Sequence, residues 1–221
     1  MSPLVSVIVA VHNQEKYLGR CLRSLLAQDM DRSEYEIVVV DDASTDRSPY
    51  ALELFSDEVQ LVRFEENRGL PSALNAGLRQ ATAPLVVRVD ADDYVNSRFL
   101  STLQQFMELN PEFDAVSCDY LLVTNDEVVL GRGNVDEAPI ACGIMFRLDQ
   151  LLELNLYDEN FLSNEDQDLR HRFLAKYSIC RVPLPLYRYR RHEENMTNDK
   201  QRLEHFDRML QRKIESGGED L

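Results

Sequence analysis

Three carboxylates stand within four residues in the segment Asp90-Ala91-Asp92-Asp93, directly after an apolar run. Carboxylates this close repel one another, so a folded chain holds them together best when a cation is near. Hard oxygen ligands suit Mg²⁺ or Mn²⁺, which commonly take one or two carboxylates along with substrate phosphates. The alternative is that Asp92 or Asp93 caps a helix over residues 96–109. On the local pattern alone, the cap is the stronger interpretation.

A second acidic cluster contains Glu165, Asp166 and Asp168 and follows Ser163-Asn164. A carboxylate here could take the proton from an attacking hydroxyl group, which is general-base chemistry. The alternative is again a helix start, because acidic side chains in a first turn complement the helix dipole. Ser163 and Asp166 also have the spacing of a capping box. The spacing by itself favours the helix start.

Basic side chains are concentrated late in the chain, between residues 181 and 192: Arg181, Arg188, Arg190, Arg191 and His192. Tyr187 and Tyr189 alternate with the arginines, which predicts a strand with tyrosines facing in and arginines facing out. Such a group of cations could stabilise a diphosphate leaving group. The alternative is a solvated strand edge.

The formal net charge of −15 comes from 24 Lys and Arg against 39 Asp and Glu. A chain with this charge repels nucleic acid at long range, so we expect no nucleic-acid partner. A phosphorylated ligand is repelled as well, unless a cation or a local basic group receives it. The acidic cluster at residues 90–93 and the basic segment at 181–192 are the places where that could happen.

The four cysteines are far apart and form no CxxC pair, which disfavours structural zinc and disulfides and predicts reduced thiols. The first residues enter a strand-like run without a basic leader. No apolar run reaches the ~20 residues that span a bilayer. We therefore expect a cytoplasmic protein, and we leave open a peripheral association with the inner face of the membrane.

The elements that must position these side chains follow an alternating pattern. Apolar, β-branched runs at 4–11, 36–40, 59–64 and 84–89 alternate with helical periodicity at 17–26, 46–55 and 71–81. This pattern predicts an α/β fold with a parallel sheet, whose ligands bind beyond the carboxyl ends of the strands. Polar residues follow each run: His12 and Asn13, then Asp41 and Asp42, then Asn67, Arg68 and Gly69, then Asp90 to Asp93. At the end of a fourth strand, the metal site becomes the better interpretation of Asp90 to Asp93.

The strand ends leave two further alternatives open. The carboxylate of Asp42 could accept the imide N–H of a uracil ring, or it could form an Asx turn or cap a helix from Asp46. Gly69 permits a tight turn, and Arg68 could meet a phosphate or remain solvated. The pattern of residues does not decide between these interpretations.

The second half of the chain is less regular and contains no internal repeat or low-complexity linker, so we expect one domain. The sequence predicts helices at 99–109, 148–154, 166–176 and 201–214, strands at 115–123, 128–130 and 184–189, a short apolar run at 143–146, a polar segment at 192–199 and a frayed tail at 216–221.

Taken together, these segments resemble the family 2 glycosyltransferases. The resemblance is strong from Val5 to about Leu100 and is patchy from there to His192. It is carried by SVIVAVHN (6–13), VVVDDASTD (38–46), ENRGLPSALNAGL (66–78), RVDADD (88–93), NEDQDL (164–169) and LYRYRRH (186–192).

The resemblance implies a GT-A fold, with a mostly parallel central sheet flanked by helices on both faces and a smaller mixed region on the C-terminal acceptor side. Residues 1–110 would be the nucleotide-sugar-binding half, residues 111–200 the acceptor-binding half of the same domain, and residues 201–221 a C-terminal helix and tail. The implied activity is inverting transfer of a sugar from a nucleotide-sugar donor, most often UDP-linked. The implied acceptor is a glycan, a lipid-linked molecule or a protein, in bacterial surface polysaccharide assembly.

The resemblance also assigns roles to residues. Asp166 would be the general base, with Glu165 beside it in the Glu-Asp pair. Mn²⁺ or Mg²⁺ would be held by Asp92, with Asp90 and His192 as further candidate ligands. The donor-binding positions would be Ala10, His12, Asn13, Asp41, Asp42, Asn67, Arg68, Gly69, Asn75, Asp90, Ala91, Arg190 and His192.

Two segments depart from the family pattern. Ala10-Val11-His12-Asn13 stands where the family often has Pro-x-Tyr-Asn, which leaves His12 to stack on the base. Asn155-Leu156-Tyr157-Asp158 replaces a Gly-Gly pair before an aromatic-Asp pair, near the acceptor in relatives. Two alternatives remain, a sugar-phosphate nucleotidyltransferase and a catalytically inactive nucleotide-sugar-binding module. The Gly-rich basic loop of the former is missing after the first strand, and the oligomeric state stays open.

Overall fold

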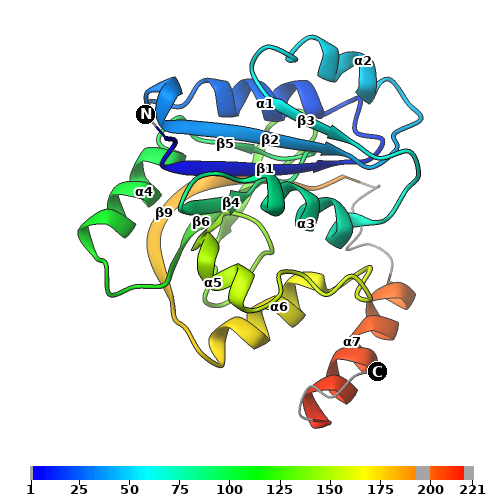
Figure 1. Ribbon diagram of the computed structural model, residues 1–221, viewed down its shortest axis with the longest axis vertical. Coiled ribbons are helices and arrows are strands. Elements are labelled where there is room, and N and C mark those ends of the chain that lie inside the picture. Colours follow the sequence, from blue (N-terminus) through cyan, green and yellow to red (C-terminus); the bar gives the residue numbers. More distant parts are fainter. Residues whose placement is uncertain (1, 193–199, 217–221) are drawn as a thin grey trace.

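The first apolar run folds as β1 (Val5–Val11), which pairs in parallel with β2 (Tyr35–Asp41) and β4 (Leu85–Arg88). The structure is a computed structural model that describes residues 2–192 and 200–216. β3 (Gln60–Arg63) adds to β2, also in parallel. Nearly every side chain of β1 and β2 is buried, as expected for parallel strands covered on both faces. The predicted parallel core is confirmed (Figure 1).

The sheet continues beyond β4 with mixed strand directions. β8 (Ile144–Arg147) is antiparallel to β4, and β6 (Ala115–Val123) is antiparallel to β8. β9 (Ile179–Arg190) runs parallel to β6, and the two-residue β5 (Tyr94–Val95) pairs with β9. β7 (Val129–Gly133) pairs with the second half of β6. The described strands therefore form one sheet, in the order β3-β2-β1-β4-β8-β6-β9-β5 with β7 beside β6.

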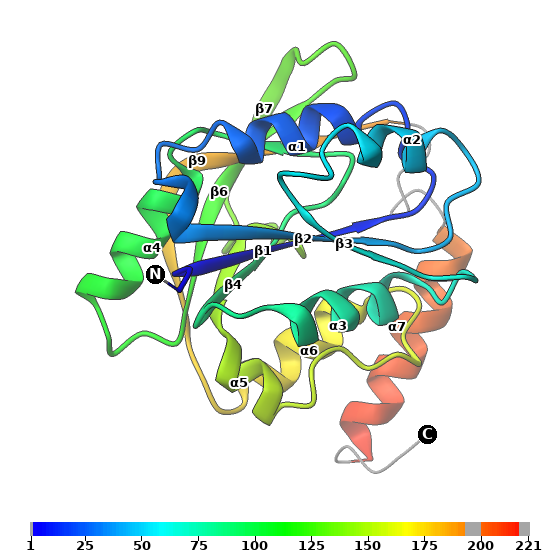
Figure 2. The same cartoon turned by 45° about the horizontal axis from the view of Figure 1, so that its top comes forward.

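Helices cover both faces of this sheet, as predicted (Figure 2). One face packs against α1 (Leu18–Leu26), α2 (Ser48–Glu53) and α4 (Phe99–Leu109), and the other against α3 (Leu70–Gln80), α5 (Leu148–Glu153) and α6 (Glu165–Leu174). A single 3₁₀ turn, η1 (Arg32–Glu34), leads into β2. Alternate side chains of β1 point into two separate apolar cores: Val7 and Val9 into the first, Ile8 into the second.

Gly77 sets how closely α3 can approach the sheet. A Cβ atom at this position would lie 2.5 Å from Cγ2 of Ile8 and 3.3 Å from Cγ2 of Val40. Only a residue without a side chain lets α3 pack at this distance. Since α3 begins just after Gly69, this close packing fixes where the loop after β3 meets the strand ends.

Several boundaries differ from the sequence-based expectation. β9 begins at Ile179 rather than at 184, although Pro183 and Pro185 interrupt the pattern. The pairing with β6 shifts register beside Asp119, so that β6 skips past Pro183. Prolines are accommodated at such bulges because no ladder hydrogen bond is required there. β7 likewise lies at Val129–Gly133 instead of 128–130.

Neither predicted side-chain cap forms, although the second acidic cluster does begin a helix, with Glu165, Asp166 and Asp168 in its first turn. α4 begins after Arg98 without a side-chain cap, and the side chains of Asp92 and Asp93 are hydrogen-bonded elsewhere. α6 begins after Asn164, which has a left-handed backbone with φ of 60° and makes no capping hydrogen bond. Because the cap is Asn164, Ser163 stands one residue before it and Asp166 is only the second residue of the helix, so the Ser163 box does not form.

α7 (Lys200–Glu215) lies beside α6 in both views of the molecule. It extends the predicted helix by one residue at each end. The predicted polar segment, from residue 193 to residue 199, and residues 217–221 of the predicted tail lie outside the described residues. Within residues 2–192 and 200–216, no helix has the length and apolar character needed to cross a bilayer.

Candidate active site

A cleft of about 790 Å³ opens at the carboxyl ends of β1, β2 and β4. Its far wall is formed by the loop Pro139-Ile140-Ala141 and by Leu203 of α7. Many of the residues predicted from the sequence line it: Ala10, His12, Asn13, Asp42, Asn67, Gly69, Asp90, Ala91, Asp92, Glu165 and Asp166. The predicted convergence of strand ends and the second acidic cluster on one cavity is therefore observed.

His12 is fixed in one tautomer by its neighbours. Its Nδ1 lies 2.7 Å from the backbone carbonyl oxygen of Asp42, which can only accept a hydrogen bond. Nδ1 must therefore carry the proton, and Nε2 accepts from the side-chain amides of Asn13, at 3.1 Å, and Asn67, at 3.0 Å. Asn13 has a left-handed backbone, with φ of 55°, and its Oδ1 accepts from the backbone N–H of Thr45.

The two aspartates after β2 have different surroundings. Asp41 is buried outside the cleft, where Oδ1 accepts from the backbone N–H of Ser44 and Oδ2 lies 3.2 Å from Nε of Arg63. Asp42 faces the cleft and accepts from the backbone N–H groups of Arg68, at 2.7 Å, and Gly69, at 2.9 Å. Asp42 thus holds the loop after β3 against the end of β2. Its carboxylate keeps further lone pairs for a ligand.

The three carboxylates after β4 point in different directions. Oδ1 of Asp90 accepts from Nε of Arg88 at 2.6 Å, and Oδ2 of Asp92 lies 2.9 Å from Nε2 of His192. Asp93 is buried, and its Oδ1 accepts from the backbone N–H of Arg190 at 2.7 Å. Burial raises the pKa of Asp90, and burial together with the Asp92 and Asp90 charges raises the pKa of Asp93 well above its usual range.

Two overlapping sets of side chains could hold a cation here. Asp92 and His192 form one pair with Asp90 nearby in the sequence. Ligand atoms of Asp90, Asp93 and Cys142 form a second set, all within 4.8 Å of one another. Burial raises the pKa of the Cys142 thiol well above its usual range, and a protonated thiol is a poor ligand for Mg²⁺ or Mn²⁺. The carboxylates fit a hard divalent cation, and the thiol does not.

Arg88 connects the loop of residues 90–93 to the second acidic cluster, a role that was not predicted from the sequence. Its buried guanidinium donates to Asp90 at 2.6 Å and, through Nη1, to Oε1 of Glu165 at 2.9 Å. A buried cation must be paired, so an arginine inside an apolar strand was a detectable signal. It is the last residue of β4 and stands two residues before Asp90.

The predicted catalytic pair is divided between two environments. Glu165 is buried and engaged with Arg88, whereas Asp166 is half-buried and lines the cleft. Burial and the neighbouring charge of Glu165 raise the pKa of Asp166 to about 6. A carboxylate with this pKa is ionised at neutral pH and is basic enough to accept a proton in a reaction. Asp166 is thus the better placed of the two to act as a base.

Arg190 does not line the cleft, although it was predicted to bind the donor. It is also buried, whereas the arginines of this strand were predicted to face outward. It is 2% exposed, and its guanidinium donates to the carbonyl oxygens of Asp92, at 2.8 Å, and Asn125, at 2.9 Å. These carbonyls compensate for its desolvation, and the guanidinium also lies over the rings of Tyr17 and Tyr94. Arg190 thus supports the backbone of the loop of residues 90–93.

Three other predicted donor-binding residues also lie outside the cleft lining. The side chain of Asn75 makes two hydrogen bonds to the backbone of Tyr157. Its Nδ2 donates to the carbonyl oxygen of Tyr157, and its Oδ1 accepts from the backbone N–H of Tyr157, both at 2.9 Å. The guanidinium of Arg68 lies over the ring of Phe64. His192 contacts Asp92, which lines the cleft, and stacks on Tyr17.

Comparison with known proteins gives a consistent set of relatives. The family model described as glycosyl transferase family 2 matches residues 6–154. The Staphylococcus aureus poly(ribitol-phosphate) beta-N-acetylglucosaminyltransferase TarS is 40% identical over 106 residues, covering 47% of this chain and 18% of TarS. The Bacillus subtilis uncharacterized glycosyltransferase EpsJ is 36% identical over 128 residues, covering 57% of this chain and 36% of EpsJ. The chain thus spans less than two thirds of the length of these relatives.

Solved structures show the same fold. Residues 1–349 of S. aureus TarS in complex with UDP-GlcNAc match with a TM-score of 0.79 and 25% identity, covering 94% of this chain and 65% of that one. The mannosyltransferase PcManGT from Pyrobaculum calidifontis, in complex with GDP-Man and Mn²⁺, matches with a TM-score of 0.76 and 23% identity, covering 97% and 64%. The fold is GT-A, as predicted. Since the family model also spans more than half of the chain, the chain belongs to glycosyl transferase family 2.

Proposed function

We propose that the protein is an inverting glycosyltransferase that moves a sugar from a UDP-linked donor to a hydroxyl group of a glycan, lipid-linked or protein acceptor. The observation that carries the proposal is the placement of Asp166, with a pKa of about 6, in the same cleft as Asp42 and Asp92. The cleft thereby combines Asp42 for the nucleobase, Asp92 for a cation and Asp166 as the proton acceptor. The TarS structure with UDP-GlcNAc supports a uridine nucleotide in a cleft of this fold.

The donor would bind along the strand ends. The free lone pairs of Asp42 would accept the imide N–H of the base, and His12, held in one tautomer, would lie against the ring. Asp92, with Asp90 and His192 nearby, would hold Mn²⁺ or Mg²⁺. A bound cation would neutralise charge on the diphosphate, which a chain of net charge −15 requires.

Asp166 would act on the acceptor. Its carboxylate takes the proton of the acceptor hydroxyl while the hydroxyl oxygen forms a bond to the anomeric carbon. The bond from that carbon to the diphosphate oxygen breaks on the opposite face, and the electron pair leaves with the nucleoside diphosphate. Attack from the face opposite the leaving group inverts the configuration at the anomeric carbon. Glu165 stays paired with Arg88 and maintains the high pKa of Asp166.

Residues 1–110 would form the donor half of the site and residues 111–200 the acceptor half, followed by the C-terminal helix and tail of residues 201–221. The TarS name, which specifies a poly(ribitol-phosphate) acceptor, supports a role in bacterial surface polysaccharide assembly. Such a role places the protein in the cytoplasm, at the inner face of the membrane where nucleotide sugars are available.

Two measurements test the proposal. Calorimetry with UDP-GlcNAc should show binding that requires Mn²⁺, and UDP release should depend on Asp166. Asp166→Asn is expected to lower the rate of UDP release at least a hundredfold, whereas Asp57→Asn, an exposed aspartate in the loop after α2, should leave it unchanged. Metal-independent binding, equal rates in the two variants, or release of pyrophosphate from a nucleoside triphosphate and a sugar phosphate would contradict it.

A further inference from the structure

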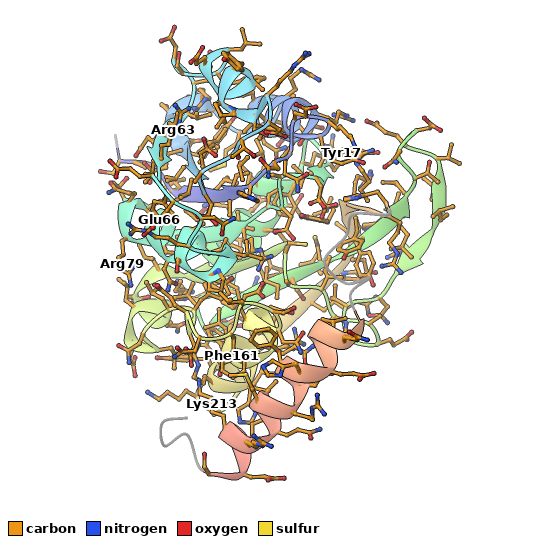
Figure 3. All side chains as sticks on the ribbon, turned by 90° about the vertical axis from the view of Figure 1, so that its right-hand side faces the viewer. Tyr17, Arg63, Glu66, Arg79, Phe161 and Lys213 are labelled. Carbon is orange, nitrogen blue, oxygen red and sulfur yellow. The ribbon has the colours of Figure 1, made fainter. Side chains whose placement is uncertain are left out.

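Residues 154–164 connect α5 to α6 and lead directly into the first turn of α6, which contains the candidate base Asp166. α7 packs on this connecting segment. Phe206 and Leu210 of α7 form a small apolar cluster with Phe161 of this segment. Figure 3 shows Phe161 and Lys213 next to each other beside α7. Nζ of Lys213 lies 5.0 Å from the centre of the Phe161 ring. Phe206, Leu210 and Lys213 follow the i, i+4, i+7 spacing of one helix face.

Polar contacts reinforce this packing at both ends of the segment. Nδ2 of Asn164 donates to Oδ1 of Asp207 at 2.6 Å. Nζ of Lys213 lies 2.6 Å from Oδ2 of Asp158 and 2.8 Å from Oδ1 of Asp168. Asp168 is almost fully buried, so its contact with Lys213 is shielded from water and salt. Side chains of α7 therefore contact the segment before α6 and the first turns of α6 itself.

These anchors stand on either side of the candidate base. Asn164 precedes Asp166 by two residues and is held by Asp207, whereas Asp168 follows it by two residues and is held by Lys213. Asn164 has a left-handed backbone, with φ of 60°, a conformation that asparagine tolerates better than most residues. The orientation of the first turn of α6 is thus determined in part from α7.

We propose that Asp207 and Lys213 are positioning residues, through which α7 sets the position of Asp166 in the cleft. This inference rests on the proposed role of Asp166 as the base. A shift of about 1 Å in a reacting group can lower a rate a hundredfold, so the two contacts are expected to matter although neither residue touches the substrate. α7 lies outside the segment that matches the family model, so this positioning device belongs to the C-terminal part of the chain.

The acid limb of the kcat–pH profile distinguishes a positioning role from a purely structural one. Loss of stability alone would not change the pH at which this limb has its midpoint. Asp166 is surrounded by Glu165 on its own helix, by Arg88 on β4 and by Tyr157 in the segment before α6. Burial contributes most to its raised pKa. Loosening α7 admits water to the first turn of α6, so the midpoint of the acid limb should move to lower pH.

The variants are Lys213→Met and Asp207→Ala, with Lys213→Arg as the conservative variant. Arg208→Met, at an exposed position of the same helix, is the matched control. With UDP-GlcNAc and Mn²⁺, and with water as the acceptor of the sugar, we measure UDP release by hydrolysis across pH. We expect kcat to fall at least tenfold in the first two variants, with KM for UDP-GlcNAc within twofold of wild type. Lys213→Arg should recover part of the loss, and Arg208→Met should match wild type.

Hydrogen exchange read by mass spectrometry provides a second measurement that does not depend on turnover. In Lys213→Met and Asp207→Ala, a peptide covering residues 158–168 should exchange faster, while one covering β2 stays unchanged and shows that the fold persists. Unchanged kcat and unchanged exchange in both variants would overturn the inference. Failure of the proposed function looks different, because wild type and Asp166→Asn would then release UDP at the same rate, and both proposals would fall.

Discussion

Replacing the candidate base should make the protein more stable. Asp166 has a folded-state pKa of about 6, above its ordinary value of 3.8, because burial and Glu165 disfavour the charged form. The folded state therefore binds this proton more tightly than the unfolded chain does. Stability from this group is lost as pH rises between about 4 and 6, and the full destabilisation is present above that range. Asp166→Asn keeps the size of the side chain and removes the charge.

The size of the gain follows from the same pKa values. The interval from 3.8 to about 6 corresponds to about 3 kcal/mol at most, since a tenfold change in proton affinity is about 1.4 kcal/mol. Because Asp166 is only half-buried, we expect about 1–3 kcal/mol at pH 8. For a chain of this length, such a gain raises the melting temperature by about 2–12 °C.

Thermal unfolding of metal-free protein at pH 8 and at pH 4 measures this effect. At pH 4 the carboxyl is protonated in the folded wild type, so the gain should nearly vanish. Asp168→Asn is the matched control, because Asp168 is paired with Arg172 and Lys213 and its replacement should destabilise the fold. An Asp166→Asn variant that melts no higher than wild type at pH 8, or whose gain is the same at pH 4, would refute the reasoning.

Three further predictions concern the same cleft. Glu165→Gln removes a charge that raises the pKa of Asp166, so the acid limb of the kcat profile should move below its wild-type midpoint near pH 6, and an unmoved limb would contradict this. Arg88→Met leaves the Asp90 and Glu165 carboxylates without their cation and should destabilise the fold by about 3–5 kcal/mol in urea unfolding; a loss under about 1 kcal/mol would argue against the network. Asp92→Ala should abolish Mn²⁺-dependent binding of UDP-GlcNAc in calorimetry, and wild-type affinity in this variant would exclude Asp92 as a ligand.

The parallel half of the sheet could be predicted from the sequence because its signals are local. β1 and β2 are apolar on both faces, and polar residues follow them directly, so the pattern marks both the strand and the edge where ligands bind. The boundaries of α4 and β6 were also predicted correctly. β9 was only partly predicted, because the register shift that accommodates its prolines depends on β6, more than sixty residues earlier.

The connections within the site could not be predicted in the same way. The pairing of Arg88 with Glu165 joins residues 77 positions apart, and that of Arg190 with the carbonyl of Asp92 joins residues 98 apart. Periodicity indicates which face of an element is buried, but it does not say which partner lies opposite. Arg190 was therefore expected at the diphosphate, whereas backbone carbonyls of Asp92 and Asn125 hold its guanidinium outside the cleft lining.

Three residues beside the cleft have left-handed backbones without being glycine: Asn13, Ala43 and Asn164, with φ of 55°, 53° and 60°. Asparagine tolerates this conformation, but for alanine it costs about 1–2 kcal/mol. Glycine at position 43 would relieve that strain. It would also give the loop after Asp42 more conformations, and this freedom would have to be lost when a nucleotide binds. The entropy of ordering this loop is thus lost once, when the chain folds, and would not be lost again on binding the proposed nucleotide-sugar donor.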